Sequence, residues 1–465
     1  MKIKIQILIE SESGNAVGVE DIVCLERGDL QPENLGLTLA EAKSLLASVQ
    51  KSMVERQTEE FIHQEACCPL CGKRRLHKGH HPLTYRTLFG KLRLRSTRMY
   101  HCDCQHQATK TFSPLAHLLP VHTAPELLYL ESKFAALMSY GLSVQLLQEV
   151  LPIGQHLNPA TVKNHVQAVA KRIDAELGDE QMFFIDGCEL EWENLPRPDM
   201  PLTVGLDGGY VHSCAQRTRK HGWFEVIAGK SVTDDGASKR FAFVHNYDEK
   251  PKRRVFEVLR SQGMQMNQQV TFLSDGADTV RDLQLYLNPN AEHILDWFHI
   301  TMRITVMCQM AKGLGPPGSE LRESVLKQLE RIKWYLWNGN VFEAIDSVGW
   351  LPDDIYVEDP VEKHKKLIQK LEEFETYIRN NARLIPNYAE RYRYGETIST
   401  AFVESTINQV VSRRMVKKQQ MRWSQKGAHL LLQIRTRVLN GELRDEFKKW
   451  YPNFDNQEEE LPLAA

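Results

Sequence analysis

Long hydrophobic runs are absent from this sequence of 465 residues. No apolar stretch approaches the roughly 18 residues that a membrane span requires, which excludes a membrane-spanning helix. The first residues, Met1–Ile9, alternate between polar and apolar types, so we expect a β-strand there instead of a signal peptide. We therefore expect a cytoplasmic protein with reduced cysteines, in which clustered cysteines indicate a metal site sooner than a disulfide.

Net charge is also nearly absent, since 58 Lys and Arg residues face 60 Asp and Glu residues. This balance does not by itself indicate a nucleic-acid partner. Acidic residues are scarce, however, in two stretches. Cys67–Cys104 contains nine Lys/Arg and one Asp, and Glu404–Lys449 contains eleven Lys/Arg and four acidic residues. Local basic patches on a neutral chain are typical of a protein that binds DNA at chosen places.

Cysteines cluster in the first basic stretch. Cys68 and Cys71 have the C-x2-C spacing of a zinc knuckle, and Cys102 and Cys104 follow about thirty residues later. The segments 83–87 and 92–96 alternate like the strands of a hairpin, with 89–91 as the turn. This pattern predicts a zinc ribbon with a structural Zn²⁺. His101 or His106 could replace one cysteine ligand, Cys67 could compete with Cys68, and free thiols on a basic hairpin are the alternative without a metal.

Helical patterns fill the segment from Thr123 to about Leu177. A short helix at 143–150, a turn and a second helix capped by Asn158 form the layout of a helix-turn-helix. In that layout Thr161, Lys163 and Asn164 would face the major groove of DNA. An ordinary helical hairpin is the alternative.

An α/β pattern follows. Strands are predicted at 200–211, 221–229, 240–245, 270–276 and 291–299, with helices at 251–262 and 277–287. This order predicts a mixed α/β sheet.

Three acidic residues stand out in and after this region. Asp207 and Asp275 each end an apolar run and precede a glycine, and rigid strand ends could hold their carboxylates for a hard cation. Asp-Gly is also a common turn, and Asp186 has the same local sequence. Glu404 heads the second basic stretch, where it could be a metal ligand or a first-turn acid favoured by the helix dipole.

Between Asp275 and Glu404 the segment from about 301 to 393 has helical patterns, broken by Gly and Pro residues at 313–318. We expect Trp334, Trp337 and Trp350 to supply its aromatic core.

Four blocks of sequence resemble the bacterial insertion-sequence transposases of the DDE superfamily. They are Val204–Gly209, Leu273–Gly276, Leu295–His299 and the region from Val403–Ser405 through Arg413–Lys418 and Trp423–Ser424 to Gly427–His429. The resemblance extends over nearly the whole chain, to about Trp450. Related Mutator-like transposases carry Asp or Cys, two residues and then His in the third block, which Asp296 and His299 match.

The resemblance implies a ribonuclease-H-like catalytic core. In that core Asp207, Asp275 and Glu404 would hold two ions of Mg²⁺ or Mn²⁺ and cleave the transposon ends by two-metal hydrolysis. His299 with its neighbour Asp296 would contact the cleaved strand or a flanking phosphate. All three acids are present, which implies an active enzyme. The helical segment before Glu404 would be an insertion domain. The departure is the short Cys102-Asp103-Cys104 knuckle, which leaves the fourth zinc ligand open.

The resemblance also implies the partners and the domain order. The partners would be double-stranded DNA, as transposon ends and target, and further copies of the chain in a homodimer or larger synaptic complex at the bacterial nucleoid. The DNA contacts in the second basic stretch would be Arg413, Arg414, Lys417, Lys418 and Arg422. The expected segments are an N-terminal α+β part (1–62), the zinc ribbon (63–115), the helix-turn-helix (120–178), the first part of the core (196–300), the insertion (301–395), the C-terminal core helices (396–450) and an acidic tail (451–465).

Two other functions fit parts of the pattern. A DNA-binding regulator would use the ribbon and helix-turn-helix and keep an inert core, so replacing the three acids would not change its activity. A nuclease with the same core would cut DNA without joining it.

Overall fold

The structure is a computed structural model. It describes residues 1–10, 16–28, 31–105, 109–154, 157–181, 184, 194–196, 202–215, 222–265, 267–277, 287, 291–358, 364–399, 401–416 and 421–454. For residues 16, 17, 357, 358, 401, 402 and 404 it describes the backbone alone. Among the described helices, none combines the length and the apolar character needed to cross a membrane.

The chain divides into two compact units. Unit 1 consists of Met1–Val169 and Gly441–Ala465, and unit 2 consists of Ala170–Asn440. The first division falls inside helix α5 (Pro159–Glu176), and the second falls between α15 (Gln425–Leu439) and α16 (Leu443–Trp450).

Unit 1 begins with an antiparallel strand pair and a long helix. Strand β1 (Lys2–Glu10) pairs with β2 (Ala16–Glu26), which confirms the strand expected at the start of the sequence. A short 3-10 turn, η1 (Pro32–Asn34), precedes α1 (Leu39–Gln64). Helix α1 begins at a capping box, in which the hydroxyl of Thr38 accepts from the N–H of Glu41 and the carboxylate of Glu41 accepts from the N–H of Thr38.

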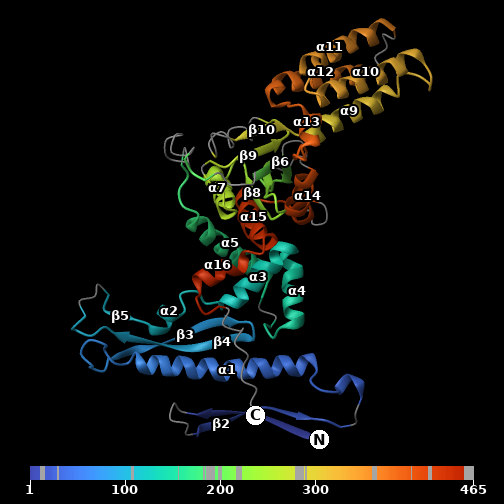
Figure 1. Ribbon diagram of the computed structural model, residues 1–465. Helices are drawn as coiled ribbons and strands as arrows, with labels where there is room; N and C mark the ends of the chain where they lie inside the picture. The colour runs from blue at the N-terminus through green and yellow to red at the C-terminus, as the bar shows by residue number, and fades with distance from the viewer. Residues whose placement is uncertain are drawn as a thin grey trace. The chain divides into compact units, whose positions relative to one another are not determined.

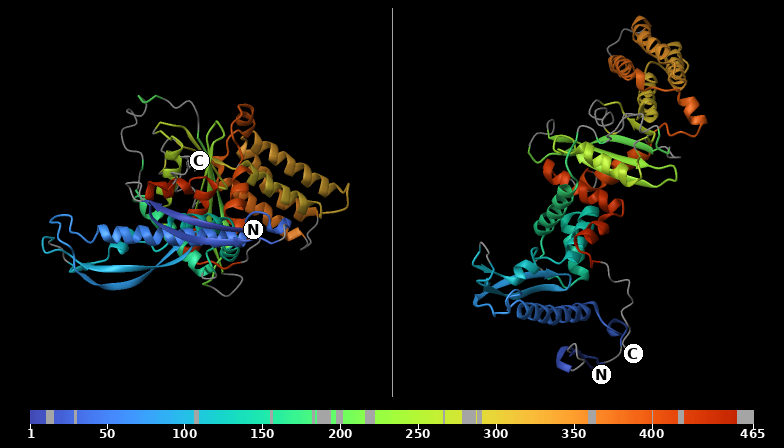
Figure 2. Two further views of the ribbon diagram at one scale, coloured as in Figure 1. Left: turned by 90° about the horizontal axis from the view of Figure 1, so that it is seen from below. Right: turned by 60° about the vertical axis from the view of Figure 1, so that its left-hand side comes forward.

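A β-hairpin packs along α1, as Figures 1 and 2 show. Strand β3 (His77–Thr87) pairs antiparallel with β4 (Gly90–Tyr100), and β5 (Thr111–Phe112) extends the sheet beside β4. The hairpin and its turn lie close to the predicted positions. Its apolar face consists of Leu83, Leu92 and Leu94, which are buried against α1 and against α2 (Pro114–Leu118). The alternation of apolar and basic residues along β4 therefore separates an inner face from an outer one.

Helices complete unit 1. They are α3 (Pro125–Leu137), α4 (Tyr140–Val150), the first part of α5 and α16. Tyr129 of α3 makes edge-on ring contacts with Phe447 of α16 and with Phe454, both at 5.6 Å between ring centroids. The C-terminal segment of the chain is thereby anchored to α3.

A five-stranded mixed sheet forms the centre of unit 2. Its strands are β6 (Leu202–His212), β7 (Trp223–Val232), β8 (Ser238–Val244), β9 (Val270–Ser274) and β10 (Glu292–Leu295), in the spatial order β10-β9-β6-β7-β8. Strand β7 runs antiparallel to β6 and β8, whereas β9 is parallel to both β6 and β10. This confirms the mixed α/β sheet that the sequence predicts.

The last strand is shorter than predicted. It ends at Leu295 because the carboxylate of Asp296 accepts from the N–H of Phe298 at 2.8 Å and caps helix α9 (Trp297–Ala311). The residues expected to end a strand, from Asp296 to His299, instead begin a helix.

One face of the sheet is apolar. Leu202, Val204 and Leu206 alternate along β6 and are buried with Phe272 of β9 against α7 (Pro251–Ser261). The intervening residues of β6, namely Thr203, Gly205, Asp207 and Gly209, belong to the opposite face, because side chains alternate along a strand.

A helical segment follows the last strand. It contains α9, α10 (Glu320–Trp337), α11 (Val341–Glu358), α12 (Lys365–Asn380), a 3-10 turn η3 (Ala382–Leu384) and α13 (Tyr388–Arg393). Its core is mainly aliphatic, with Leu329, Ile332 and Leu336 of α10 in one buried cluster with Val348 and Leu351 of α11. The same cluster also contains the buried rings of Phe374 and Tyr388. The helical character predicted for about 301–393 is therefore confirmed among the described residues.

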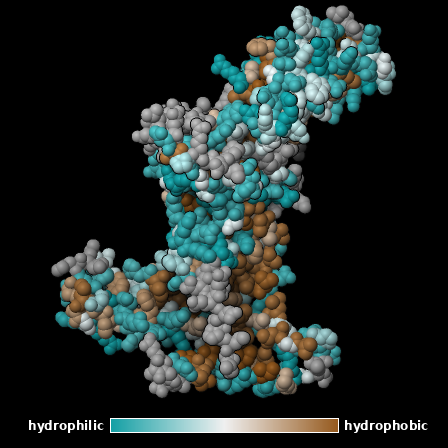
Figure 3. Space-filling view, in the orientation of Figure 1, coloured by the Kyte–Doolittle hydropathy of each residue, from teal (hydrophilic) through white to brown (hydrophobic). Residues whose placement is uncertain are grey.

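The aromatic core predicted for this segment is wrong for two of three tryptophans. Trp334 is 57% exposed and Trp350 is 69% exposed, because both lie off the buried stripes of α10 and α11. Trp337 packs against Trp297 at 5.0 Å between ring centroids and also contacts Tyr388. Figure 3 shows exposed hydrophobic residues in this segment as brown patches among hydrophilic teal ones.

Three helices return to the sheet. Helix α14 (Ala401–Ile407) packs on β6 and β7, and it continues into a π-helical stretch, η4 (Asn408–Val416). Helix α15 packs on β8. The guanidinium of Arg435 on α15 donates to the carbonyls of Val410, at 2.7 Å, and Gln409, which fastens α15 to the wide turns of η4.

Candidate functional site

The four cysteines predicted as metal ligands come together. The Sγ atoms of Cys68, Cys71, Cys102 and Cys104 all lie within 4.8 Å of one another. Cys68 and Cys104 are separated by 3.4 Å, as are Cys71 and Cys102. Among the described residues this is the group of His, Cys, Asp and Glu side chains compact enough to hold a metal ion. Four thiolates at this spacing could hold a structural metal such as zinc.

The backbone of the first knuckle holds its cysteines in place. The N–H of Cys68 donates to the carbonyl of Lys73, and the N–H of Gly72 donates to the carbonyl of Cys68, both at 2.9 Å. Gly72 has a φ of 69°, which favours glycine because a side chain would be strained there. The C-x2-C-Gly sequence thus closes a tight turn that points both thiols to one side.

The alternative ligands are placed elsewhere or lie outside the described residues. Cys67 is exposed and forms a β-bridge with Arg74. The ring of His101 stacks on Phe112 with centroids 4.6 Å apart. His106 lies outside the described residues. The compact group therefore consists of cysteines alone.

Electrostatics favour a thiolate in this cluster. Burial raises the pKa of Cys68. Hydrogen bonds from the backbone of Cys71 and Leu70 and from neighbouring thiols lower this pKa by more, so the net result is a lowered pKa of about 6. The pKa of Cys104 is raised, chiefly by its hydrogen bond with Cys68. One thiol of the pair is thus poised to be the thiolate, which is the form that binds metal.

A second group of predicted residues lies along three parallel strands. Asp207 is in the middle of β6, and Asp275 and Asp296 directly follow β9 and β10. Gly205 of β6 pairs with Leu273 of β9, so Asp207 and Asp275 each lie two residues further along their strands and at the same level. Leu295 of β10 pairs with Ser274, so the next residues, Asp296 and Asp275, are also level. The register therefore brings Asp207, Asp275 and Asp296 to the same level on three neighbouring strands.

Burial and neighbouring charges shift the pKa of Asp207. Burial raises its pKa, and the carboxylates of Asp275 and Asp296 raise it further, whereas His299 and the N–H of Gly208, which donates to Asp207 Oδ1 at 2.8 Å, lower it. The net shift is upward. Closely placed carboxylates that repel one another in this way are common where a cation binds.

Asp275 is held by the helical segment. Its backbone carbonyl accepts from the hydroxyl of Tyr377 at 3.0 Å, and its carboxylate accepts from the N–H of Ala277. The next residue, Gly276, has a φ of 83°, and a Cβ atom there would lie 2.4 Å from Oδ1 of Asn381. Glycine after Asp275 is therefore required by both conformation and space.

Asp296 and His299 form a pair on the first turn of α9. Asp296 is fully buried, and its Oδ2 lies 3.6 Å from Nε2 of His299, which is partly exposed. Spacing of three residues on a helix brings the two side chains together. The buried carboxylate thus orients an accessible imidazole near Asp207.

Glu404 belongs to α14, and its side chain lies outside the described residues. The helix itself packs on β6 and β7. A Cβ atom on Gly209 would lie 3.4 Å from Ile407 and 3.7 Å from Val411, so the end of α14 rests on β6 two residues beyond Asp207. Glu404 precedes Ile407 by three residues, or about one helical turn.

The residues predicted to contact DNA differ in accessibility. Lys163 and Asn164 are exposed on α5, and Thr161 is half-buried, with its N–H donating to Asn158 Oδ1. Arg413 and Arg422 are exposed, and Lys417 and Lys418 lie outside the described residues.

Arg414 differs from the expectation. It is fully buried, with its guanidinium 5.2 Å from the ring centroid of Trp423. A buried guanidinium does not reach a DNA phosphate, so Arg414 is a packing residue in this structure.

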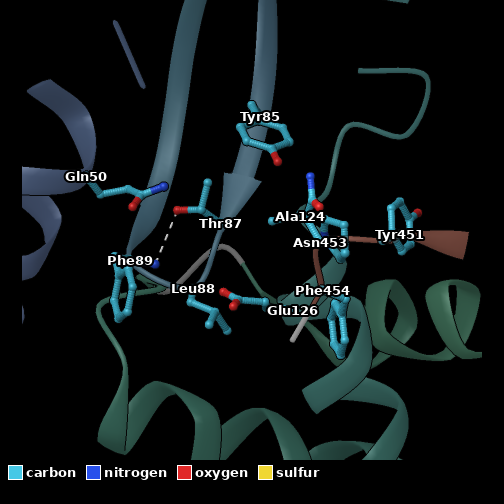
Figure 4. Close-up of a pocket in the computed structure, with 11 residues that line it drawn as sticks. Gln50, Tyr85, Thr87, Leu88, Phe89, Ala124, Glu126, Tyr451, Asn453 and Phe454 are labelled. Carbon is cyan, nitrogen blue, oxygen red and sulfur yellow. Dashed lines mark hydrogen bonds between the residues drawn. The ribbon is translucent and has the colours of Figure 1, made fainter. Parts of the chain in front are cut away.

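Two pockets were not predicted from the sequence. Figure 4 shows one of about 370 Å³ in unit 1, between Gln50 of α1, the end of β3 at Tyr85 and Thr87, and Glu126 at the start of α3. The other, of about 510 Å³, lies in unit 2 beside Thr203, Lys230 and Thr271. Neither includes a residue predicted as catalytic or metal-binding, and local sequence gives no signal for pockets assembled from such distant segments.

Comparisons with known proteins add little. No protein-family model matches the sequence, and no curated protein matches it. Among solved structures, the chain is similar to the Drosophila P element transposase strand transfer complex, with a TM-score of 0.24 and 12% identity over 72% of this chain and 82% of that chain. We draw nothing about fold or function from a likeness this weak.

Proposed function

We propose that the chain is a DNA transposase of the DDE class with a ribonuclease-H-like core. The observation that carries this proposal is the strand register, which brings Asp207 and Asp275 level on neighbouring parallel strands. The proposal is also supported by the carboxylates of Asp275 and Asp296, whose charges raise the pKa of Asp207. Helix α14, which bears Glu404, packs on the same strand as Asp207.

The topology of the sheet supports the proposed fold. Three consecutive antiparallel strands are followed by two strands that add, in parallel, to the other side of β6. This topology supports the proposal of a ribonuclease-H-like core. The helical segment from α9 to α13 would be the insertion between the second and third acids.

Asp207, Asp275 and Glu404 would hold Mg²⁺ or Mn²⁺, because carboxylate oxygens are the ligands that these hard cations prefer. The bound ions would activate water and stabilise the leaving oxygen of a phosphodiester. Asp296 would orient His299, and the imidazole of His299 would contact a phosphate of the cleaved strand. Hydrolysis would leave a 3′-hydroxyl, which attacks target DNA in a transesterification that exchanges one phosphodiester bond for another.

The remaining segments would bind DNA and assemble the complex. The segment at 63–115 would be a zinc ribbon, and 120–178 a helix-turn-helix that presents Thr161, Lys163 and Asn164 to transposon ends. Exposed Arg413 and Arg422 would contact the DNA backbone near the acids. Paired cleavage of two ends would require at least two copies of the chain.

An in vitro cleavage and joining assay tests the proposal. It contains purified protein, Mg²⁺, a DNA fragment carrying the native flanks of the gene, and a target plasmid. We expect nicks with 3′-hydroxyl ends and joined products. Asp207→Asn and Asp275→Asn should each lower both products by more than 100-fold, whereas exposed Asp235→Asn should leave them unchanged.

Other outcomes select the other functions. Cleavage without joined products would identify a nuclease. DNA binding with no cleavage by the unaltered protein, and no change of biological activity in the aspartate variants, would identify a regulator with an inert core.

A further inference from the structure

One face of the hairpin β3–β4 concentrates positive charge. Lys91, Arg93 and Arg95 alternate along β4 and are exposed, opposite the apolar face that packs on α1. Arg86 of β3 pairs directly with Lys91. We refer to these four residues as the basic row. The hairpin strands and their turn, from His77 to Tyr100, contain no Asp or Glu.

The four residues of the basic row place positive charges close together. Within the described part of the chain, no salt bridge joins any of the four residues to a carboxylate. Arg86 and Lys91 are like charges in directly opposed positions, which destabilises a sheet. The pKa of His80 is lowered by burial and by the positive charges of Arg95 and His77. The hairpin thus keeps a repulsive arrangement that a bound polyanion would relieve.

We propose that the basic row binds the phosphate backbone of double-stranded DNA without reading its bases. This inference rests on DNA as the partner in the proposed function, and it assigns the contact to residues outside the helix-turn-helix. Alternate residues on a strand are about 6.8 Å apart, close to the separation of successive phosphates along one DNA strand. Lys91, Arg93 and Arg95 could therefore each meet one phosphate.

The same face favours duplex over single-stranded nucleic acid. Proteins that bind single strands place aromatic rings between their charges, on which bases stack. The residues of β3 that pair with Arg93 and Arg95 are Thr84 and Pro82, so neither arginine is paired with an aromatic side chain. A row of charges at every second residue suits the regular backbone of a duplex.

Two features hold the row rigid. Its reverse side is fixed by Leu83, Leu92 and Leu94 in the core with α1 and α2. The cysteine cluster spans the base of the hairpin, since Cys71 precedes β3 and Cys102 follows β4. Preformed spacing lowers the entropy lost when several phosphates are bound together.

The test measures the affinity of the full chain for a random-sequence duplex as a function of salt. Each phosphate contact contributes about 0.9 to the slope of log affinity against log salt. We expect the triple variant Lys91→Ala/Arg93→Ala/Arg95→Ala to lower that slope by roughly 2.7. The matched control, Lys327→Ala/Lys333→Ala/Lys366→Ala, removes the same charge from exposed positions of α10 and α12 and should leave the slope unchanged.

A conservative variant separates backbone binding from base reading. Arg93→Lys/Arg95→Lys keeps the charges but removes the paired donors with which arginine reads guanine. We expect it to retain the slope and to bind different duplex sequences equally. Bound metal and circular dichroism, unchanged in every variant, would show that the hairpin is folded.

Three results would overturn the inference. They are a triple variant with the slope of the unaltered protein, a lysine variant that binds as weakly as the triple variant, and single-stranded RNA that competes as well as duplex DNA. The proposed function fails separately, if the unaltered protein binds no DNA at all.

Discussion

At the scale of single residues, buried charges in unit 2 are held by specific partners. Arg254 on α7 pairs with Asp174 at 2.9 Å and with Asp248 at 2.8 Å, and it donates to Gln433 of α15 at 2.6 Å. Burial alone would lower the pKa of Arg254, yet its acidic partners raise it. The arginine therefore joins α5, α7 and α15 through one guanidinium.

Replacing Arg254 with Ala should destabilise unit 2. The substitution leaves the buried carboxylate of Asp248 without its arginine partner, which costs about 3 kcal/mol or more. The partly exposed Asp174 loses one partner and keeps the other, His429. Urea unfolding followed by tryptophan fluorescence measures the loss. The control is Arg260→Ala on the same helix, where the arginine is 60% exposed and its pair with Glu257 contributes little. Equal effects of the two variants would contradict the role assigned to Arg254.

The ionised carboxylate of Asp207 should destabilise the folded protein when no cation is bound. Its folded pKa is raised above the unfolded value, chiefly by burial. The stability that its proton contributes is fully present below the unfolded pKa and is lost as pH rises through the folded pKa. Without divalent ions, Asp207→Asn should therefore melt at a higher temperature than the unaltered protein at pH 7, and the difference should vanish near pH 3.

Asp235 provides a control, because its pKa is shifted in the direction opposite to that of Asp207. Its pKa is lowered, first by the hydroxyl of Thr233 and then by the N–H of Ala237. Its ionised form therefore stabilises the fold above the unfolded pKa, and this contribution is lost as pH falls through the folded pKa. Asp235→Asn should lower the melting temperature slightly at pH 7. A pH-independent shift in either variant would contradict the electrostatic account.

At the scale of elements, the hairpin β3–β4 combines a small core with a cysteine cluster. Its buried residues are few, namely Leu83, Leu92, Leu94 and the neighbouring Leu115. Small cores of this kind commonly depend on a bound metal for stability. The cysteine cluster should therefore stabilise the hairpin when a metal is bound.

Cys68→Ser should abolish metal binding, whereas Cys67→Ser should not. Both residues are adjacent cysteines, but the thiol of Cys68 belongs to the compact group and that of Cys67 does not. We expect one zinc ion per chain in the unaltered protein and in Cys67→Ser, and none in Cys68→Ser, by elemental analysis. Proteolysis within 77–100 should accelerate in Cys68→Ser alone. Metal retained in both variants would overturn the ligand set.

Local signals predicted most elements, because each depends on its own residues. The cap at Thr38, the C-x2-C knuckle and the apolar runs before Asp207 and Asp275 are features of short segments. The level alignment of the two aspartates is a property of strand register, which depends on distant pairing. The sequence could therefore identify the two aspartates as candidates, but it could not predict that they lie at the same level of the sheet.

The errors have the same origin. Which side of a helix is buried depends on the neighbouring helices, which local sequence does not reveal. For this reason the sequence places Trp334 and Trp350 in the core, whereas both are exposed. Arg414 lies in a π-helical stretch, whose wider turns change which residues face inward. Arg414, a basic residue expected on the surface, is buried in this stretch.

At the scale of the whole molecule, the chain order and the spatial units do not coincide. The C-terminal residues from Gly441 belong to unit 1, although the preceding helix α15 belongs to unit 2. Phe447 on α16 is fully buried and contacts Tyr129 of α3. Helix α16 therefore packs in unit 1, the unit that also contains the N-terminal residues. The proposed catalytic acids all fall in unit 2, and the cysteine cluster and the basic row fall in unit 1.

Phe447→Ala should therefore act on unit 1 through its ring contacts with Tyr129 and Phe454. Truncating a buried phenylalanine costs about 3–5 kcal/mol. Release of metal from the cysteine cluster during urea unfolding, followed with a chromogenic chelator, reports on unit 1. We expect Phe447→Ala to shift this release to lower urea, and Arg254→Ala to leave it unchanged because its partners lie in unit 2. Equal shifts in both variants would mean that the two units unfold as one, and the division between them would have no thermodynamic counterpart.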